Sequence, residues 1–471
     1  MNKNSYFPYI VQTTKRWGIR VFFVSNNAKI HKNSKNYWTF MFKYTNIELT
    51  VKRNKKQEGN KRMKGNVIVG QSGGPTAAIN ASLAGVYRTA KDRGANKVYG
   101  MLHGIQGLLK EKYIDLSDHI KTELDAELLK RTPAAFLGSC RYKLPEIHEN
   151  REVYDKIFEI LDKLDIEAFI YIGGNDSMDT VSKLSRYAAQ IGSDIRIIGE
   201  PKTIDNDLVH TDHTPGYGSA ARYVASTVRE ITTDANVYEK KSVTIVEIMG
   251  RHAGWLTAAS ALARKYVNDN PLLIYLPETA FDQEAFLHAV EKSFEKNCNV
   301  VVCVSEGIHD ASGTFICEYD SSVGTDTFGH KMLAGCGKYL ENLVRSRLGV
   351  KARSVELNVC QRCSVSMMSA IDQKEAISAG TFGVQAALNG ETGKMVSFIR
   401  LKTADGSYSM ECSLEDVNEI CNEEKTVPQE WICKDGSDVT EDFINYARPL
   451  IQGAVDIPYG EDGLPDFVYR K

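Results

Sequence analysis

The fold of this chain is decided by the stretch Ala168-Phe169-Ile170-Tyr171-Ile172-Gly173-Gly174-Asn175-Asp176-Ser177. Its first half is an apolar run too short for a helical pattern, whereas Val181, Leu184, Ala188 and Ile191 follow at near-helical spacing. The pattern predicts a strand, a glycine turn and a helix. Because glycines let the backbone approach a ligand and the free N–H groups of a helix start attract anions, a phosphate would suit this turn.

A second segment, Pro201-Lys202-Thr203-Ile204-Asp205-Asn206-Asp207, follows another apolar run and so also lies where a strand ends. In open α/β sheets, ligands gather beyond the carboxyl ends of strands, so both segments can face one crevice. Further strand candidates alternate with helical stretches, at residues 67–69, 243–248, 272–276, 299–305 and 355–359. This alternation predicts an α/β fold with parallel sheets covered by helices.

The second segment supplies the groups that a phosphoryl transfer needs. Lys202 is a cation, Thr203 a hydroxyl, and Asp205 and Asp207 are carboxylates. In an extended stretch, Thr203, Asp205 and Asp207 would line one side. Transfer of phosphate to an alcohol uses a carboxylate to take the hydroxyl proton, another to hold Mg²⁺, and cations for the transferring oxygens. Taken alone, Asp-Asn-Asp is also typical of an acidic surface turn with Asx hydrogen bonds, and the rest of the chain decides for catalysis.

Several motifs accompany these two segments in a fixed order. They are Ser72-Gly73-Gly74, Phe136-Leu137-Gly138-Ser139-Cys140-Arg141, Met249-Gly250-Arg251-His252-Ala253-Gly254-Trp255, Val304-Ser305-Glu306-Gly307 and Gln361-Arg362. From about residue 64 to 451 the series resembles the phosphofructokinase family, in its pyrophosphate-dependent branch. The resemblance implies two Rossmann-like lobes with the active site in the cleft between them. It also implies reversible phosphoryl transfer from pyrophosphate to the C1 hydroxyl of fructose 6-phosphate.

Two positions indicate the phosphoryl donor. ATP-using relatives carry Gly-Gly-Asp-Gly and Pro-Gly-Thr-Ile-Asp-Asn-Asp, whereas this chain has Asp176 and Lys202 in place of the two variable glycines. A carboxylate there fills space and repels the α-phosphate of a nucleotide, and a lysine offers an ammonium to compact pyrophosphate. The alternative is that Asp176 caps the helix and Lys202 is a solvated surface charge.

The resemblance also implies roles for single residues. Asp205 takes the hydroxyl proton, Lys202 and Arg251 offset charge on the transferring group, and Thr203 positions it. The donor is expected at Gly73, Gly74, Arg141, Gly174, Asp176 and Lys202. The sugar phosphate is expected at Thr203, Asp205, Met249, Gly250, Arg251, Glu306, Arg353 and Arg362, with one of the last two arginines supplied by a neighbouring subunit in related tetramers.

The metal is expected at Asp207, with Asn175 nearby. Asn175 stands where the ATP-type pattern has an aspartate, and its neutral amide is a weaker ligand, so it is expected to hydrogen-bond a water on Mg²⁺. An aspartate pKa of about 3.9 in short peptides would leave Asp205 ionised and only weakly basic.

Composition sets the broad class. The chain has 471 residues, 42% of them hydrophobic, without an apolar run of the roughly 18 residues that span a bilayer. Ten scattered cysteines indicate free thiols in a reducing compartment, and zinc or redox chemistry at Cys360 and Cys363 is disfavoured for lack of partner ligands. Residues 1–64 carry 15 of the 58 basic side chains and only two acidic ones. We expect a cytoplasmic enzyme that binds neither nucleic acid nor membrane.

Four segments are expected. Residues 1–63 form a basic extension that is disordered or lies upstream of a true start at Met63, and residues 64–205 form the phosphoryl-donor lobe. The sugar-phosphate lobe spans residues 206–365, and residues 366–471 form C-terminal helices and partly rejoin the donor lobe. By resemblance the protein is a homodimer or homotetramer.

Alternatives stay open at this point. An ATP-dependent 6-phosphofructokinase is the nearest, and a non-catalytic regulatory subunit of the same fold is the other, although the intact Thr203 to Asp207 segment argues against it. Sedoheptulose 7-phosphate also presents a ketose hydroxyl with a distal phosphate, so it is a possible second acceptor.

Overall fold

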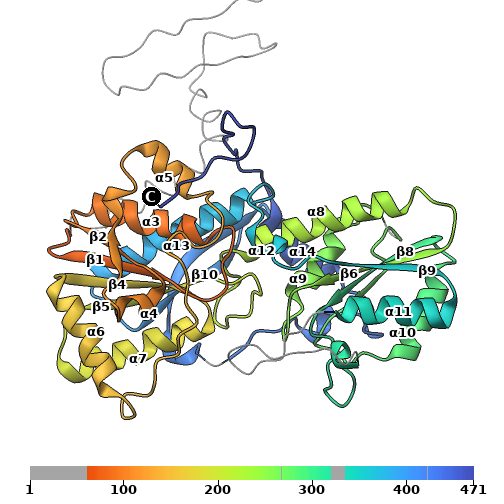
Figure 1. Cartoon of the computed structure of the whole chain (residues 1–471), viewed down its shortest axis with the longest axis horizontal. Coiled ribbons are helices and arrows are strands. Elements are labelled where there is room, and N and C mark those ends of the chain that lie inside the picture. Colours follow the sequence, from red (N-terminus) through yellow and green to blue (C-terminus); the bar gives the residue numbers. More distant parts are fainter. Residues whose placement is uncertain (1–60, 267, 320–334, 422, 471) are drawn as a thin grey trace, which may run out of the picture. The chain divides into compact units, whose positions relative to one another are not determined.

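The structure is a computed structural model that describes residues 61–266, 268–319, 335–421 and 423–470 (Figure 1). The expectations for the basic extension therefore lie almost entirely outside the described residues. In the described part of the chain, helices cover both faces of two separate sheets. No helix in these ranges is long and apolar enough to cross a membrane.

The first sheet has seven strands in the order β11-β10-β5-β4-β1-β2-β3. Its interior strands run parallel, whereas β2 with β3 and β10 with β11 form antiparallel pairs at the two edges. An edge strand of a mixed sheet needs no crossover helix, which is how these pairs fit an otherwise parallel sheet. The strands are β1 Asn66–Gln71, β2 Val98–Met101, β3 Tyr113–Asp115, β4 Ile166–Gly173, β5 Arg196–Pro201, β10 Lys394–Lys402 and β11 Tyr408–Asp416.

Side chains of the first sheet alternate between two helical layers. Val67 and Val69 of β1 pack in a core with α3 and α13, and Ile68 packs in a separate core with α6 and α7. A strand buried on both faces needs an unbroken apolar run, which β1 and β4 have. The helices are α3 Ile79–Asp92, α4 Gly104–Leu108, α5 Glu123–Leu129, α6 Arg151–Lys163, α7 Asn175–Ile191 and α13 Ala370–Leu388.

The second sheet has four parallel strands in the order β7-β8-β6-β9. Val243 and Ile245 of β6 face a core with α10 and α11, and Val246 and Ile248 face a core with α8 and α9. The strands are β6 Ser242–Ile248, β7 Leu273–Tyr275, β8 Asn299–Ser305 and β9 Lys351–Glu356. The helices are α8 Tyr217–Ala235, α9 Trp255–Ala258, α10 Gln283–Ser293, α11 Cys336–Leu348, α12 Cys360–Cys363 and α14 Glu441–Ala447.

One local expectation is wrong. The strand predicted at residues 355–359 is β9 and ends at Glu356, because Asn358 takes a left-handed conformation (φ +43°) and residues 360–363 turn into α12. The helical spacing that ends at Ile191 is confirmed, because α7 also ends at this residue, before the left-handed Gly192.

The chain visits the two sheets alternately. It leaves β5 for α8 of the second sheet, and α13 and β10 then return it to the first. Beyond β11 it enters the second sheet's core again, through Val427, Ile432, Phe443 and Leu450. Segments far apart in the sequence, such as α8 and residues 427–450, therefore pack in the same core.

Candidate active site

The two segments that decided the fold lie side by side at the carboxyl ends of two interior strands of the first sheet. Gly173 ends β4 and pairs with Pro201, which ends β5, and the Lys202 N–H donates to the Gly173 carbonyl at 2.9 Å. A side chain at Gly173 would overlap the Ser177 hydroxyl, so this approach requires glycine. As predicted, both segments lie beyond the carboxyl ends of adjacent parallel strands.

Lys202 is buried against the glycine loop that follows β1. Its ammonium donates to the Gly74 carbonyl at 2.6 Å, and only 2% of the residue is exposed. The preceding Gly73 has φ +75°, which favours glycine, and the Ser139 hydroxyl donates to its carbonyl at 2.6 Å. The interpretation of Lys202 as a solvated surface charge is therefore wrong.

Three groups of the catalytic segment, which we define as residues 201–207, lie together although the segment is not extended. The Asp205 N–H donates to the Thr203 hydroxyl at 3.0 Å, and this hydroxyl also lowers the pKa of Asp205 and Asp207 by hydrogen bonding, against the larger effect of burial. Asn206 is fully buried with φ +54°, so the strand-like alternation expected here is wrong. A tight turn around one hydroxyl brings the two carboxylates together instead.

Asn206 explains why this turn is held in place. Its side chain donates to the Tyr446 hydroxyl at 2.9 Å and accepts from the Thr214 N–H at 3.1 Å, and the Thr214 hydroxyl donates to the Thr203 carbonyl. Asparagine tolerates the left-handed conformation better than most residues. The surface-turn interpretation fails because this asparagine is an anchor in the interior.

Burial changes the acid–base character of the segment. It raises the pKa of Asp205 to about 7, and the neighbouring charge of Asp207 adds to the shift. It also raises the pKa of Asp207. Burial lowers the pKa of Lys202 to about 8 although Asp205 and Asp207 oppose the change. The weakly basic aspartate expected from peptide values is therefore wrong, because desolvation and a like charge both disfavour the ionised form.

The second sheet contributes a carboxylate and an arginine from two adjacent strand ends. Met249, Gly250 and Arg251 follow β6, and the Gly250 N–H donates to a Glu306 carboxylate oxygen at 3.3 Å just beyond β8. Burial raises the pKa of Glu306 to about 7, with Asp205 adding to the rise and Arg251 opposing it. Glu306, Asp205 and Arg251 thus interact electrostatically although they come from different sheets.

Two further arginines lie near the donor loop. A Cβ built on Gly74 would stand 3.7 Å from a guanidinium nitrogen of Arg362, and the charges of Arg362 and Arg141 both contribute to the lowered pKa of Lys202, after burial. Arg141 is exposed, and its loop is joined to the glycine loop by the Gly73 N–H, which donates to the carbonyl of residue 140. Arg141, Lys202 and Arg362 thus place positive charge near Gly73 and Gly74.

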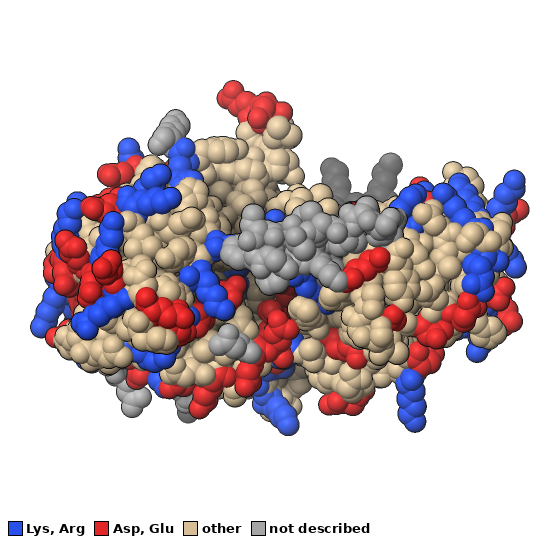
Figure 2. Space-filling view, turned by 60° about the horizontal axis from the view of Figure 1, so that its bottom comes forward, with Lys and Arg blue, Asp and Glu red and all other residues tan. Residues whose placement is uncertain are grey.

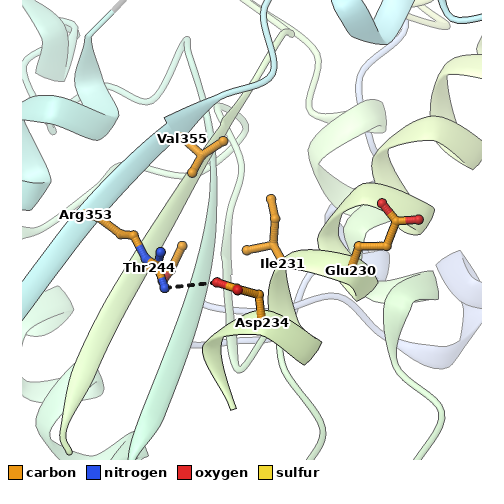
Figure 3. A pocket seen from close by; sticks show the side chains of 6 residues that line it. All are labelled: Glu230, Ile231, Asp234, Thr244, Arg353 and Val355. Carbon is orange, nitrogen blue, oxygen red and sulfur yellow. Dashed lines mark hydrogen bonds and ion pairs between the residues drawn. The ribbon is translucent and has the colours of Figure 1, made fainter. Parts of the chain in front are cut away.

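Arg353 lies elsewhere. It pairs with Thr244 in the middle of β6, about 13 Å short of the carboxyl end of that strand at 3.3 Å per residue. Its guanidinium is 3.3 Å from Asp234 and 3.3 Å from the Thr244 hydroxyl, in a pocket that Glu230, Ile231 and Val355 also line (Figure 3). The structure does not bring Arg353 into the group around Asp205.

The start of α7 carries the other residues that were expected near the donor and the metal. The Asn175 amide donates to the Glu423 carbonyl at 2.7 Å, and Asp176 is exposed in the first helical turn. The N-cap residue is Gly174, without a side-chain capping bond, so Asp176 does not cap this helix by hydrogen bonding. Its charge still complements the positive end of the helix dipole.

One charged side chain close to Asp207 was not found by sequence reasoning. Lys425 lies in a polar stretch with no motif, and it packs over the Trp255 ring, 5.2 Å from the centroid. Burial lowers its pKa to about 8, opposed by Asp212 and Asp207. Only the return of the chain to the second sheet reveals this position, so no local signal could have found it.

The carboxylates fit a hard cation bound through few protein ligands. Oδ1 of Asp207 is buried and has no hydrogen-bond partner among the described residues. These residues include no cluster of three or more His, Cys, Asp or Glu side chains suited to a metal. Mg²⁺ typically takes one or two carboxylates and completes its shell with water and substrate phosphates, which matches this set.

The chain belongs to the phosphofructokinase family, whose pattern it matches over residues 66–388. It is 41% identical over 409 residues to the pyrophosphate–fructose 6-phosphate 1-phosphotransferase of Xanthomonas campestris pv. campestris (strain B100), covering 86% of this chain and 96% of that protein. The protein of the same name from Rhodospirillum rubrum is 41% identical over 82% of this chain and 94% of its own length. The crystal structure of a pyrophosphate-dependent phosphofructokinase from Nitrosospira multiformis superposes with a TM-score of 0.77 at 34% identity, over 86% of this chain and 95% of that one.

Proposed function

We propose that this enzyme reversibly transfers a phosphoryl group from pyrophosphate to the C1 hydroxyl of fructose 6-phosphate. The observation that carries the proposal is the buried ammonium of Lys202, which lies 2.6 Å from the Gly74 carbonyl. ATP-type sequences have a glycine in place of this lysine. A fixed charge at this point suits a small, highly charged donor. The names of the relatives that are about 40% identical support the same reaction.

Asp205 is the proposed general base. Its pKa of about 7 lies near the operating pH, where a carboxylate is both ionised and basic enough to take the hydroxyl proton. Thr203 holds the turn through the Asp205 N–H and so orients the carboxylate. Lys202 and Arg251 offset the charge that spreads over the transferring oxygens, and such preorganised charges carry most of a phosphoryl-transfer acceleration.

Asp207 is the proposed protein ligand of Mg²⁺, with Asn175 within reach of a water on the metal. When bound, the ion would neutralise charge on the phosphate oxygens. Asp207 offers its unpartnered oxygen for this purpose, while its backbone carbonyl accepts from the Lys425 N–H at 2.7 Å.

The sugar phosphate is proposed to lie against the second sheet. Met249, Gly250 and Glu306 present backbone and carboxylate groups to its hydroxyls, and Arg251 reaches both substrates. Arg362, beside the donor loop, neutralises phosphate oxygens at the border of the two sites. Arg353 sits in its own pocket, and this position supports the proposal that it serves a neighbouring subunit.

Other properties are proposed on the same basis. We assign the lobes to residues 64–205 and 206–365, with residues 366–471 shared between them, and the assembly to a homodimer or homotetramer in the cytoplasm. All ten cysteines are free thiols, which suits a reducing compartment. On the face shown in Figure 2, acidic and basic side chains are interspersed rather than gathered into one basic stripe.

A paired donor assay tests the reaction. The purified chain is given fructose 6-phosphate and Mg²⁺ with either pyrophosphate or ATP, and fructose 1,6-bisphosphate is quantified. We expect turnover with pyrophosphate and none with ATP. Turnover with ATP alone would identify the ATP-dependent alternative, and inactivity with both donors would support the non-catalytic one.

A further inference from the structure

A short segment near the C-terminus, residues 423–427, joins three parts of the active site, and we refer to it as the strap. The Glu423 carbonyl accepts from Asn175 at the start of α7, and the Lys425 N–H donates to the Asp207 carbonyl at 2.7 Å. The Lys425 carbonyl accepts from the Trp255 indole at 2.8 Å. The strap therefore contacts the start of α7, the catalytic segment and the Met249 to Trp255 motif that contains Arg251.

The far end of the strap is anchored in the second sheet's core. The Val427 N–H donates to a Glu278 carboxylate oxygen at 2.9 Å, and the same oxygen accepts from the Gly254 N–H at 2.8 Å. Val427 is 1% exposed. Because one buried carboxylate bonds both the strap and the backbone before Trp255, these two elements are fixed relative to each other.

The Lys425 side chain holds the loop that leaves Asp207. Its ammonium donates to the carbonyls of Thr211 at 3.0 Å and Asp212 at 2.9 Å. Residues 207–212 lie in neither a helix nor a strand, so their backbone needs bonds from other segments to keep one conformation. Lys425 thus bonds this loop at both ends, through its N–H at Asp207 and through its ammonium at residues 211–212.

We propose that Lys425 is a positioning residue that fixes the Asp207 carboxylate for Mg²⁺. This inference rests on the proposed function, in which Asp207 is the metal ligand. The ammonium contributes by immobilising the backbone of the loop, through its bonds to the carbonyls of Thr211 and Asp212. Partners that orient a metal ligand typically change metal affinity or activity 10- to 100-fold when they are removed.

The test is Lys425→Met, which keeps the apolar stem over Trp255 and removes the ammonium. Mn²⁺ binding to the protein, with no other ligand present, is measured by electron paramagnetic resonance, and steady-state kinetics are measured at saturating Mg²⁺. We expect the Kd for Mn²⁺ to rise about tenfold and kcat to fall 10- to 100-fold, with the KM for fructose 6-phosphate within about twofold. The matched control is Lys434→Met, an exposed lysine of the same C-terminal region, which should change none of these values.

Several outcomes would overturn the inference. Native Mn²⁺ affinity in Lys425→Met would do so. A loss of Mn²⁺ affinity would also do so if Tm fell and the KM for fructose 6-phosphate rose in proportion, because the bonds of Lys425 would then be purely structural. If Lys425→Met does not fold, Lys425→Gln takes its place, because it also removes the ammonium while keeping a polar end, and native Mn²⁺ affinity in that variant overturns the inference. A native enzyme that binds Mn²⁺ but makes no product from pyrophosphate would instead refute the proposed function, and Mn²⁺ binding would still test Lys425.

Discussion

Two lysines approach Asp207 from different parts of the chain: the buried Lys202 from the catalytic segment and the half-buried Lys425 from the strap. Burial lowers the pKa of both to about 8, and the charge of Asp207 opposes the shift in each. Their hydrogen bonds differ. Lys202 donates to the Gly74 carbonyl of the donor loop, whereas Lys425 donates to the carbonyls of residues 211–212, behind the catalytic turn.

The difference shows that similar electrostatics can serve different tasks. An ammonium beside the glycines can contact the donor itself, so its removal should affect the reacting groups directly. An ammonium bonded to loop carbonyls acts only through the groups that the loop carries. The comparison predicts that changes in the catalytic segment affect the chemical step most and that changes in the strap affect metal binding most.

Asp205→Asn gives the largest expected effect. The amide keeps the shape of the side chain but cannot take the hydroxyl proton, so kcat should fall about a thousandfold, with the KM for fructose 6-phosphate within a few fold. Fructose 1,6-bisphosphate formation from pyrophosphate measures the loss. Asp118→Asn, at an exposed aspartate, is the control. Retention of a tenth of the native rate would remove Asp205 from the role of base.

Lys202→Met tests the comparison directly. Loss of one preorganised charge from the donor site should lower kcat/KM for pyrophosphate by about a hundredfold or more. At saturating Mg²⁺, Lys425→Met should leave the KM for pyrophosphate within about threefold, since Lys425 bonds the loop and not the donor site. Equal rises of this KM in the two variants would contradict the division of tasks between the lysines.

The same two lysines show how far sequence reasoning reaches. Lys202 was predicted because it follows a strand and replaces a glycine within a recognisable motif. Lys425 stands in an ordinary polar stretch, and its place depends on how residues after β11 return to the second sheet. Strand ends and glycine loops follow local patterns, so the central parallel strands and the turns at their carboxyl ends were predictable. The strands β2, β3, β10 and β11, with their two antiparallel pairs, and the contacts made by a late crossing of the chain were not.

Burial was the other property that sequence could not supply. Peptide pKa values describe Asp205 in water, but its basicity depends on desolvation and on Asp207, and both follow from the turn at Asn206. The expected alternation along an extended segment failed for the same reason, because the left-handed conformation of Asn206 depends on partners such as Tyr446. Arg353 was assigned by motif position alone, and its mid-strand position became visible only through the register of β9.

A change of pH should alter kcat/KM by a smaller factor, in a direction that the two pKa shifts determine. Asp205 acts as a base only when ionised, so below its pKa of about 7 the value of kcat/KM should fall tenfold per pH unit. Lys202 acts only when protonated, so kcat/KM should fall again above about pH 8. In Lys202→Arg the guanidinium stays charged, and the alkaline decline should move to higher pH while the acid decline stays. An unchanged alkaline decline in that variant would assign it to another group.

The smallest effect is expected from Asp176→Gly. This variant extends the comparison from the two lysines to an exposed charge beside the donor loop. Because Asp176 is exposed, its loss should change turnover with pyrophosphate by no more than about threefold, and the buried ammonium of Lys202 should still prevent the use of ATP. Removing both charges in Asp176→Gly with Lys202→Gly restores the ATP-type pattern, and we expect measurable turnover with ATP in the paired donor assay. If the double variant retains some activity with pyrophosphate and still ignores ATP, the discrimination lies elsewhere, and the strap, which contacts Asn175 beside Asp176, is the next segment to vary.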